Sequence, residues 1–353
     1  MNIRALSMAL TWTALAGWLE VSALAAESEL SITGRIHFNI NVSDFSRSRP
    51  FYTLLGFTDS VGGFPESNTI EVSQAVGFAD VYRLKAELAY FGRLPEEPLD
   101  LTVPTGRFID LIEWLEPKRV EEPYQNLNHL GMARFALTTT NLDADIAFLK
   151  ARGIGFLSPA AAQRANGSRF IIFRDPDGTY IELVEDPGMR TPAGAGLHTT
   201  GIRYVNVNVS NFERSQAFYR MLGFTEASSL PATENTEVAR AMGFDEPYMI
   251  KGALLTNPLD GSVIELVEWL NPSDESPPYS TPINHLGIHR MNWATADLEG
   301  DVAKLKAKGV TFLSEIAPCC TGDTSTFGII VFADPDGIYN QLMGNLPLDS
   351  GSN

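Results

Sequence analysis

The sequence predicts an α+β protein made of two tandem copies of one domain. The main observation is that four blocks of the 353-residue chain recur in the same order: 35–57, 108–117, 128–158 and 173–183 return at 203–224, 263–272, 284–314 and 332–342. Within each copy, a segment with strand alternation precedes one with helical periodicity, and further strands follow before this pattern repeats. Each domain is therefore expected to contain two βαβββ modules.

The first module begins at residues 36–42, which alternate like a half-buried strand. Ser43 or Asp44 can cap the helix that follows, and Gly56 can end it. Pro50 is tolerated in this helix only if the helix starts late enough to place it in the first turn. The second copy has Ala217 at the matching position and carries no such constraint.

The second module repeats the plan. Residues 133–139 read as a strand, and 142–151 read as an amphipathic helix closed by a glycine. Two further strands, 169–173 and 179–185, flank the sequence DPDG, which is typical of a tight turn because Pro presets one dihedral angle and Gly takes the left-handed position.

These signals divide the chain as follows: a signal peptide at 1–26, a first domain at 27–188, a linker at 189–200, a second domain at 201–346 and a tail at 347–353. The linker lies in a stretch that contains Pro and Gly. The signal peptide is expected because Arg4 precedes the uncharged, largely apolar stretch 5–19, and small residues around Ala25 and Ala26 offer a cleavage site. The alternative is an uncleaved N-terminal anchor. Cleavage would place the mature protein in a periplasm or outside the cell, with no stable membrane span.

Composition limits the partners. A formal net charge of −17 and the lack of Lys and Arg runs argue against a nucleic-acid partner. The two cysteines, Cys319 and Cys320, are adjacent, so a strained bridge between neighbours is conceivable, but two free thiols in a loop are the expectation. Because tandem copies often replace a homodimer, we expect a monomer with pseudo-symmetric domains.

The recurring motifs resemble the vicinal oxygen chelate superfamily, which includes glyoxalase I, methylmalonyl-CoA epimerase, extradiol dioxygenases and bleomycin-resistance binding proteins. The resemblance rests on S-D/N-F-x-R-S-x-x-F-Y-x-x-L-G-F, I-D/E-L-x-E-W-L-x-P, G-x-x-R and D-P-D-G-x-Y-x-E/Q-L, and it covers about residues 35–344. It implies that paired modules curl into a cup-shaped mixed sheet. Fold alone does not settle the chemistry in this superfamily.

The resemblance assigns four inward positions to each domain. In the first domain it places His37, Asp110 and Glu182 where metal-binding members carry ligands, and it implies one iron, manganese, nickel or zinc ion there. The fourth position holds Arg134, which has no lone pair for a metal. Arg134 could repel the metal, pair with one of the carboxylates, or hold a substrate anion in bidentate fashion.

In the second domain the matching positions hold Tyr204, Glu265, Arg290 and Gln341, so no metal is expected there. The repetition of Arg at one position suggests a shared structural or ligand-holding need. The tryptophans Trp114 and Trp269 lie on the cup-facing parity and could line an apolar pocket, although core packing is the simpler interpretation.

Other polar residues are assigned structural roles. His129 and His285 both lie in the sequence NHLG, and their repetition in the metal-poor copy favours a turn or packing role. Glu113 and Glu268 have the opposite parity to the inward carboxylates and should point outward. The first domain also carries an extra stretch, 90–106, which could close over its cup or be an ordinary surface insertion.

Two functions follow. The first is an extracytoplasmic glyoxalase-like lyase or isomerase, with the metal held by His37, Asp110 and Glu182, with Glu182 moving a proton and Arg134 stabilising an oxyanion. An extradiol-type dioxygenase fits less well, because such members usually show two His and one Glu. The second is a metal-free protein that binds a small molecule through a larger set of side chains: Arg134, Trp114, Tyr204, Glu265 and Arg290. Retention of His and Glu in one copy favours the enzyme, and Arg in both copies favours the binding protein.

Overall fold

The computed structural model describes residues 29–97, 99–100, 103–118, 121–192, 194–233, 235–319 and 325–347. The expected signal peptide lies outside the described residues. Among those described, no helix is both long and apolar enough to cross a bilayer.

The first repeat contains eight strands: β1 (Ile32–Asn41), β2 (Asp59–Gly63), β3 (Arg83–Tyr90), β4 (Phe108–Glu116), β5 (Arg134–Thr139), β6 (Ala162–Gln163), β7 (Arg169–Arg174) and β8 (Tyr180–Glu185). Its helices are α1 (Phe45–Leu55), α2 (Ile70–Ala75) and α3 (Leu142–Lys150), and the 3-10 helix η1 (Pro187–Met189) follows.

The second repeat has the same order, with strands β9 (Thr199–Val209), β10 (Thr225–Leu230), β11 (Met249–Thr256), β12 (Val263–Asn271), β13 (Gly287–Thr295), β14 (Ala317–Cys319), β15 (Phe327–Ala333) and β16 (Tyr339–Asn345). Its helices are α4 (Phe212–Met221), α5 (Thr236–Ala241) and α6 (Leu298–Ala307). The predicted α+β fold of curled, eight-stranded mixed sheets built from βαβββ modules is confirmed.

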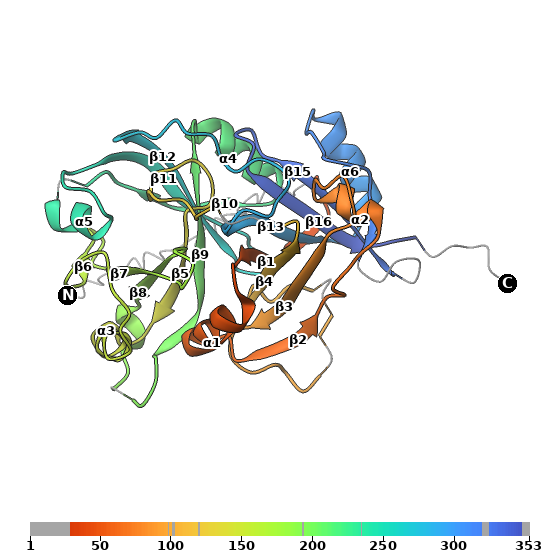
Figure 1. Cartoon of the computed structure of the whole chain (residues 1–353). Helices are drawn as coiled ribbons and strands as arrows, with labels where there is room; N and C mark the ends of the chain where they lie inside the picture. The colour runs from red at the N-terminus through yellow and green to blue at the C-terminus, as the bar shows by residue number, and fades with distance from the viewer. Residues whose placement is uncertain are drawn as a thin grey trace, which may run out of the picture.

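The pairing of the modules is the main surprise. The first sheet has the order β14-β15-β16-β13-β1-β4-β3-β2, and the second has the order β10-β11-β12-β9-β5-β8-β7-β6. Each sheet therefore joins one module from each repeat: the first and last modules share a sheet, and the two middle modules share the other. In Figure 1 the orange strands of the N-terminal module lie beside the blue strands of the C-terminal module.

The strand register shows how modules from different repeats are joined in one sheet. Strand β1 pairs antiparallel with β13, so that His37 lies opposite Asn292, while β5 pairs antiparallel with β9, so that Ala136 lies opposite Tyr204. The opening strands of all four modules share the same alternation, and each pairs with the opening strand of a module from the other repeat.

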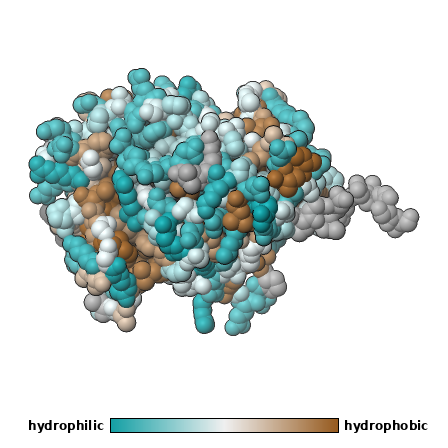
Figure 2. Space-filling view, viewed as in Figure 1, coloured by the Kyte–Doolittle hydropathy of each residue, from teal (hydrophilic) through white to brown (hydrophobic). Residues whose placement is uncertain are grey.

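The main core lies between the two sheets. Alternation sends Phe38 and Ile40 of β1, and Phe135 and Leu137 of β5, into one buried cluster. The rings of Phe38 and Phe135 lie 5.2 Å apart. The opposite face of each sheet forms a cup. On the side of the molecule drawn in Figure 2, hydrophobic surface gathers where α2 lies beside the first sheet.

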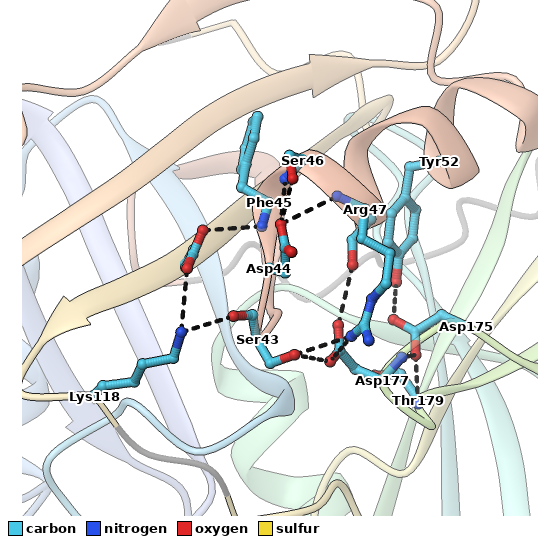
Figure 3. A network of polar contacts seen from close by, with 12 residues as sticks. Ser43, Asp44, Phe45, Ser46, Arg47, Tyr52, Lys118, Asp175, Asp177 and Thr179 are labelled. Carbon is cyan, nitrogen blue, oxygen red and sulfur yellow. Dashed lines mark hydrogen bonds and ion pairs between the residues drawn. The ribbon is translucent and has the colours of Figure 1, made fainter.

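Each repeat nevertheless stays tied together by a clamp between a helix and a turn. Asp177, in the predicted DPDG turn, accepts hydrogen bonds from Ser43, Ser48 and Arg47 at the start of α1. Asp175 accepts 2.8 Å from the Tyr52 hydroxyl (Figure 3). The second repeat builds the same clamp, in which Asp336 binds Ser210, Ser215 and Arg214.

Two local expectations need correction. Pro50 is the sixth residue of α1 and not part of its first turn. The helix tolerates it because both Pro50 and Ser46, whose carbonyl loses its helical partner, are exposed, so water can solvate that carbonyl. Cys319 is disulfide-bonded and not a free thiol. Cys320, the other cysteine of the chain, lies outside the described residues.

Candidate functional site

The polar positions expected from the sequence fall into two separate cups. We call the first sheet's cavity cup A and the second sheet's cavity cup B. Cup A encloses about 380 Å³ and is lined by His37, Asp110, Arg290 and Gln341. Cup B encloses about 180 Å³ and is lined by Arg134 and Glu265. Glu182, which accepts a hydrogen bond from Arg134, also accepts one from the Tyr204 hydroxyl. The structure therefore does not bring His37, Asp110 and Glu182 together, and the expected three-ligand site of the first domain is not formed.

Strand register shows that the two cups are equivalent position by position. Arg290 lies opposite Tyr339 across β13 and β16, as Arg134 lies opposite Tyr180 across β5 and β8. The same registers match Gln341 with Glu182. In the other half of each cup, Asp110 pairs with Asn39 as Glu265 pairs with Asn206.

Cup B pairs its arginine with two carboxylates, although Arg134 Nη1 is buried without a hydrogen-bond partner. Arg134 donates through Nε to Glu182 Oε2 at 3.0 Å, and its Nη2 forms an ion pair with Glu265. Glu182 also accepts from Arg164 Nη2 at 2.6 Å and from the Tyr204 hydroxyl at 2.8 Å. Two arginines thus meet two glutamates in a neutral, buried network.

The pKa shifts in cup B follow from this pairing. Burial alone would lower the pKa of Arg134, but Glu265 and Glu182 raise it above its ordinary value. Burial alone would raise the pKa of Glu182, but Arg164 and Arg134 hold it below its ordinary value. Glu182 is fully charged and fully bonded, so it is not available as the proton-transfer group that the sequence suggested.

Cup A leaves its arginine almost unpaired. The closest carboxylate oxygen, Asp110 Oδ2, lies 3.9 Å from Arg290 Nη2. Arg290 Nε and Nη1, Asp110 Oδ1 and Gln341 Oε1 are all buried without a hydrogen-bond partner. Such groups are costly in a closed protein interior, and their convergence on one cavity is a property of binding sites.

Burial also shifts the charges in cup A. It raises the pKa of Asp110 to about 7, against the opposing effect of Arg290. It lowers the pKa of His37 well below its usual range, and Arg290 and Arg35 act in the same direction, so the imidazole is neutral. His37 Nε2 lies 3.0 Å from the amide nitrogen of Asn292. At neutral pH, Arg290 is therefore the dominant charge in the cavity.

The walls of cup A are apolar and aromatic. Trp114 packs against Tyr82 at 5.0 Å between ring centroids, and its indole nitrogen donates to Asn41 Oδ1 at 3.0 Å. Other lining residues are Ile36, Val72, Leu84, Leu88 and Ile112. In cup B, Trp269 occupies the matching place and donates to Asn208. Both tryptophans line a cavity, as the sequence suggested, and both also belong to packed clusters.

The residues given structural roles lie outside both cups, but Glu113 and Glu268 are only partly exposed instead of lying on the surface as expected. Glu113 accepts from the backbone of Phe45 at the start of α1, and Glu268 does the same for Phe212 at the start of α4. The His129 and His285 rings stack on Tyr124 and Tyr279, at 4.1 and 4.4 Å.

Sequence reasoning missed three contributors to the cups. Tyr82 and Asn292 line cup A, and Arg164 lies between β6 and β7 over cup B. Asn292 follows Arg290 by two residues, so strand alternation would have placed it on the same face. Nothing in the local sequence distinguishes Arg164 from a surface arginine.

Comparison with known proteins agrees with this architecture. The family model described as Glyoxalase/Bleomycin resistance protein/Dioxygenase superfamily matches residues 34–183 and 201–342. The chain belongs to this superfamily, as a tandem member. No curated protein matches it.

Solved structures of the superfamily show the same fold at low sequence identity. Glyoxalase I from Zea mays is 17% identical, with a TM-score of 0.55, and the match covers 88% of this chain and 92% of that one. A putative dioxygenase from Bacillus subtilis subsp. subtilis str. 168 is 13% identical, with a TM-score of 0.53 and coverage of 90% and 87%.

Members of this superfamily often use a divalent metal, so the fit of cup A to such an ion matters. Its possible donors are His37, Asp110 and Gln341, but the fourth position is a guanidinium that would lie beside the cation and repel it. Burial also favours the protonated form of Asp110 up to about pH 7, which weakens it as a ligand. Within the described parts of the chain, no three His, Cys, Asp or Glu side chains are grouped as a metal site. The residues of cup A do not fit a divalent metal.

Proposed function

We propose that this protein binds a small organic anion in cup A, with the ligand's carboxylate, or a similar oxyanion, held by Arg290 and its apolar body held by the walls around Trp114. The single observation that carries this proposal is the difference between equivalent positions: Glu182 meets Arg134 in cup B, whereas Gln341 leaves Arg290 without a second carboxylate in cup A. A ligand carboxylate can supply the missing group.

The chemistry of the cavity supports this assignment. A guanidinium offers a planar pair of donors that matches a carboxylate, and burial strengthens the bond. The amide of Gln341 and the neutral ring of His37 add hydrogen-bonding groups without a competing negative charge. The volume, about 380 Å³, suits a small molecule with an apolar body.

Both cups are complete within one chain, which supports a monomer as the functional unit. The sequence of residues 1–26 supports an extracytoplasmic setting, and it is the basis of that part of the proposal.

The test is calorimetric titration of the full chain with octanoate and with 1-octanol, which share a tail and differ in the head group. Octanoate should bind at least tenfold more tightly than octanol, and Arg290→Met should remove this preference. The matched control is Gln125→Glu, a change near the surface that adds a negative charge outside cup A and should leave both affinities unchanged. Equal binding of the two probes, or binding of octanoate that is insensitive to Arg290→Met, would disprove the proposal.

One observation favours a second function, which is proton transfer without a metal. Asp110 has a pKa of about 7 and a buried, unpartnered Oδ1 that faces the same cavity as Arg290. A carboxylate with such a pKa can accept a proton from the carbon next to a bound carbonyl while a guanidinium stabilises the enolate oxygen. This retains the isomerase or lyase chemistry suggested by the sequence, with Asp110 in place of Glu182 as the proton acceptor.

Proton transfer is tested by NMR. A 2-oxo acid such as 2-oxooctanoate, incubated with the protein in D₂O, should exchange its C3 protons faster than in buffer alone. Asp110→Asn should abolish the acceleration while binding persists. Exchange at the buffer rate with the wild-type protein would leave cup A as a binding site only.

A further inference from the structure

A second cavity lies next to cup A. Its volume is about 430 Å³, it lies between β2 and the segment 94–97 together with Leu99, and we call it the outer chamber. Its walls include Val61, Leu94, Pro95 and Leu99, so it is largely apolar. The segment belongs to the extra stretch of the first repeat, which the sequence left as either a cover for the cup or an ordinary insertion.

The outer chamber and cup A share part of their walls. Gly63, Phe64 and Leu88 line both cavities. Phe64 is half-buried and packs against two hydrophobic clusters, one around Trp114 in cup A and one around Tyr90 beside the chamber. The Phe64 ring therefore stands at the boundary between the two cavities.

Local geometry fixes the position of this ring. Strand β2 ends at Gly63, after a register shift in its pairing with β3 between Ser60 and Gly63. A Cβ atom on Gly63 would lie 2.5 Å from the carbonyl oxygen of Ala86, so the backbone approaches β3 more closely than a side chain would permit. Phe64 is the next residue, so this close approach places its side chain at the boundary of cup A.

The charged residues make the two ends of the space formed by cup A and the outer chamber different. Arg290 lies at the inner end, in cup A, whereas Glu96 and Glu97 line the outer chamber. An anionic group is therefore favoured at the inner end and disfavoured at the outer end. The apolar surface between them suits a hydrocarbon tail.

Cup B offers the internal comparison. There, β11 ends at Thr256 and β12 begins at Val263, so the matching connection is short. Leu230 takes the place of Phe64, since each is followed by Pro, and it lines the smaller cavity of cup B. The extra stretch and the outer chamber thus lie beside cup A, the cup with the unpaired arginine.

We propose that the ligand of cup A is an amphiphilic monocarboxylate whose apolar tail passes Phe64 and occupies the outer chamber. This inference rests on the proposed function and extends it to the ligand class: one anionic head, a tail longer than cup A holds, and no negative charge at the far end.

Calorimetry with octanoate, decanoate and dodecanoate tests the tail. Each added methylene that leaves water should tighten binding roughly threefold to fourfold. Leu94 lines the outer chamber and not cup A, so Leu94→Asp should reduce this gain to less than twofold per methylene while octanoate affinity stays within threefold of wild type. Phe64→Trp should also reduce the gain per methylene, since the larger ring narrows the passage between the two cavities. Leu230→Trp in cup B is the matched control and should change none of these affinities.

Dodecanedioate tests the charge at the far end. It should bind at least tenfold more weakly than dodecanoate, and the double change Glu96→Gln with Glu97→Gln should recover most of the difference.

Gains per methylene that are the same in wild type, Phe64→Trp and Leu94→Asp would overturn the inference, as would equal binding of the mono- and dicarboxylate. If octanoate binds in an Arg290-dependent manner in such a case, the proposed function stands and only the extension fails. If no carboxylate binds, both are overturned.

Discussion

Cup A and cup B are built from equivalent strands of a duplicated chain, yet one is filled by its own charges and the other is not. In cup B, Arg134 is neutralised by Glu182 and Glu265. In cup A, the matching positions hold an amide, Gln341, and a shorter acid, Asp110, whose Oδ2 is 3.9 Å from the guanidinium. The comparison teaches that two small changes beside a fixed arginine, Glu to Gln and Glu to Asp, separate an internal ion-pair network from a cavity with free donors.

The largest expected effect is on stability. Arg134→Met leaves two buried carboxylates without their shared partner and should lower the free energy of unfolding by about 3–5 kcal/mol. Arg290→Met should cost less than about 1.5 kcal/mol at pH 6, because Asp110, the one acid that faces it among the described residues, has a pKa of about 7 and can be protonated. Urea unfolding of both variants at pH 6 measures the difference. Equal losses would mean that the two arginines are equally well paired.

The next effect is on binding. Gln341→Glu should give cup A the carboxylate that cup B has, and the new side chain should compete with a ligand for Arg290. We expect octanoate affinity to fall at least tenfold, as measured by calorimetry at pH 7.5. The reciprocal change, Glu182→Gln in cup B, serves as the control because it should leave octanoate affinity within twofold of wild type. A Gln341→Glu protein that binds octanoate normally would show that the ligand does not take the place of the missing carboxylate.

The sequence predicted more about each module than about how modules combine. The resemblance to the superfamily placed His37, Asp110, Arg134 and Glu182 on the cup-facing side. In the structure His37 shares a cup with Asp110, and Arg134 shares the other cup with Glu182. The step from pairs to a four-residue site failed because the opening strands of all four modules have similar alternation. Pairing within a repeat and pairing across repeats bury the same faces, so local sequence does not distinguish them.

The charges of the site were also beyond sequence reasoning. Whether Glu182 is a metal ligand, a base or half of an ion pair depends on Arg164, which reaches it from a turn 18 residues earlier. The pKa of Asp110 depends on how deeply it is buried, and motif spacing does not report that quantity. The sequence also does not show that Leu94 and Leu99 of the extra stretch line a cavity.

A moderate effect of pH should distinguish the cups further. Below about pH 7, Asp110 is protonated and cup A is more positive, so an anionic ligand binds more tightly; above that pH, the Asp110 carboxylate competes for Arg290 and repels the ligand. The other groups facing Asp110 do not titrate in this range, since burial lowers the pKa of His37 well below its usual range and raises that of Tyr82 to about 12.

Octanoate affinity should therefore rise about threefold to tenfold from pH 8 to pH 6. Asp110→Asn should bind at least as tightly as wild type at pH 8 and show a flat profile over the same range. Calorimetry in buffers of matched ionic strength measures both. An affinity that increases with pH, or an equally steep profile in Asp110→Asn, would contradict the assignment of Asp110 as the titrating group.

The smallest effect concerns the part of the molecule where the repeats do not differ. Asp177 and Asp336 hold the starts of α1 and α4 through the same hydrogen bonds to two serines and one arginine. The arginines, Arg47 and Arg214, are about half exposed, so water screens the ion pairs and most of the stabilisation comes from the hydroxyl groups. Asp177→Asn and Asp336→Asn should each cost about 1 kcal/mol, and the two values should agree within about 0.5 kcal/mol. Urea unfolding at pH 7 checks both.

Neither change should alter octanoate affinity, because the clamps join each helix to a turn of its own repeat, whereas each cup is built from modules of both repeats. A clamp variant that weakens binding in cup A would show that the helices help to set the shape of the cup, so the difference between the cups would no longer lie in their charged residues alone.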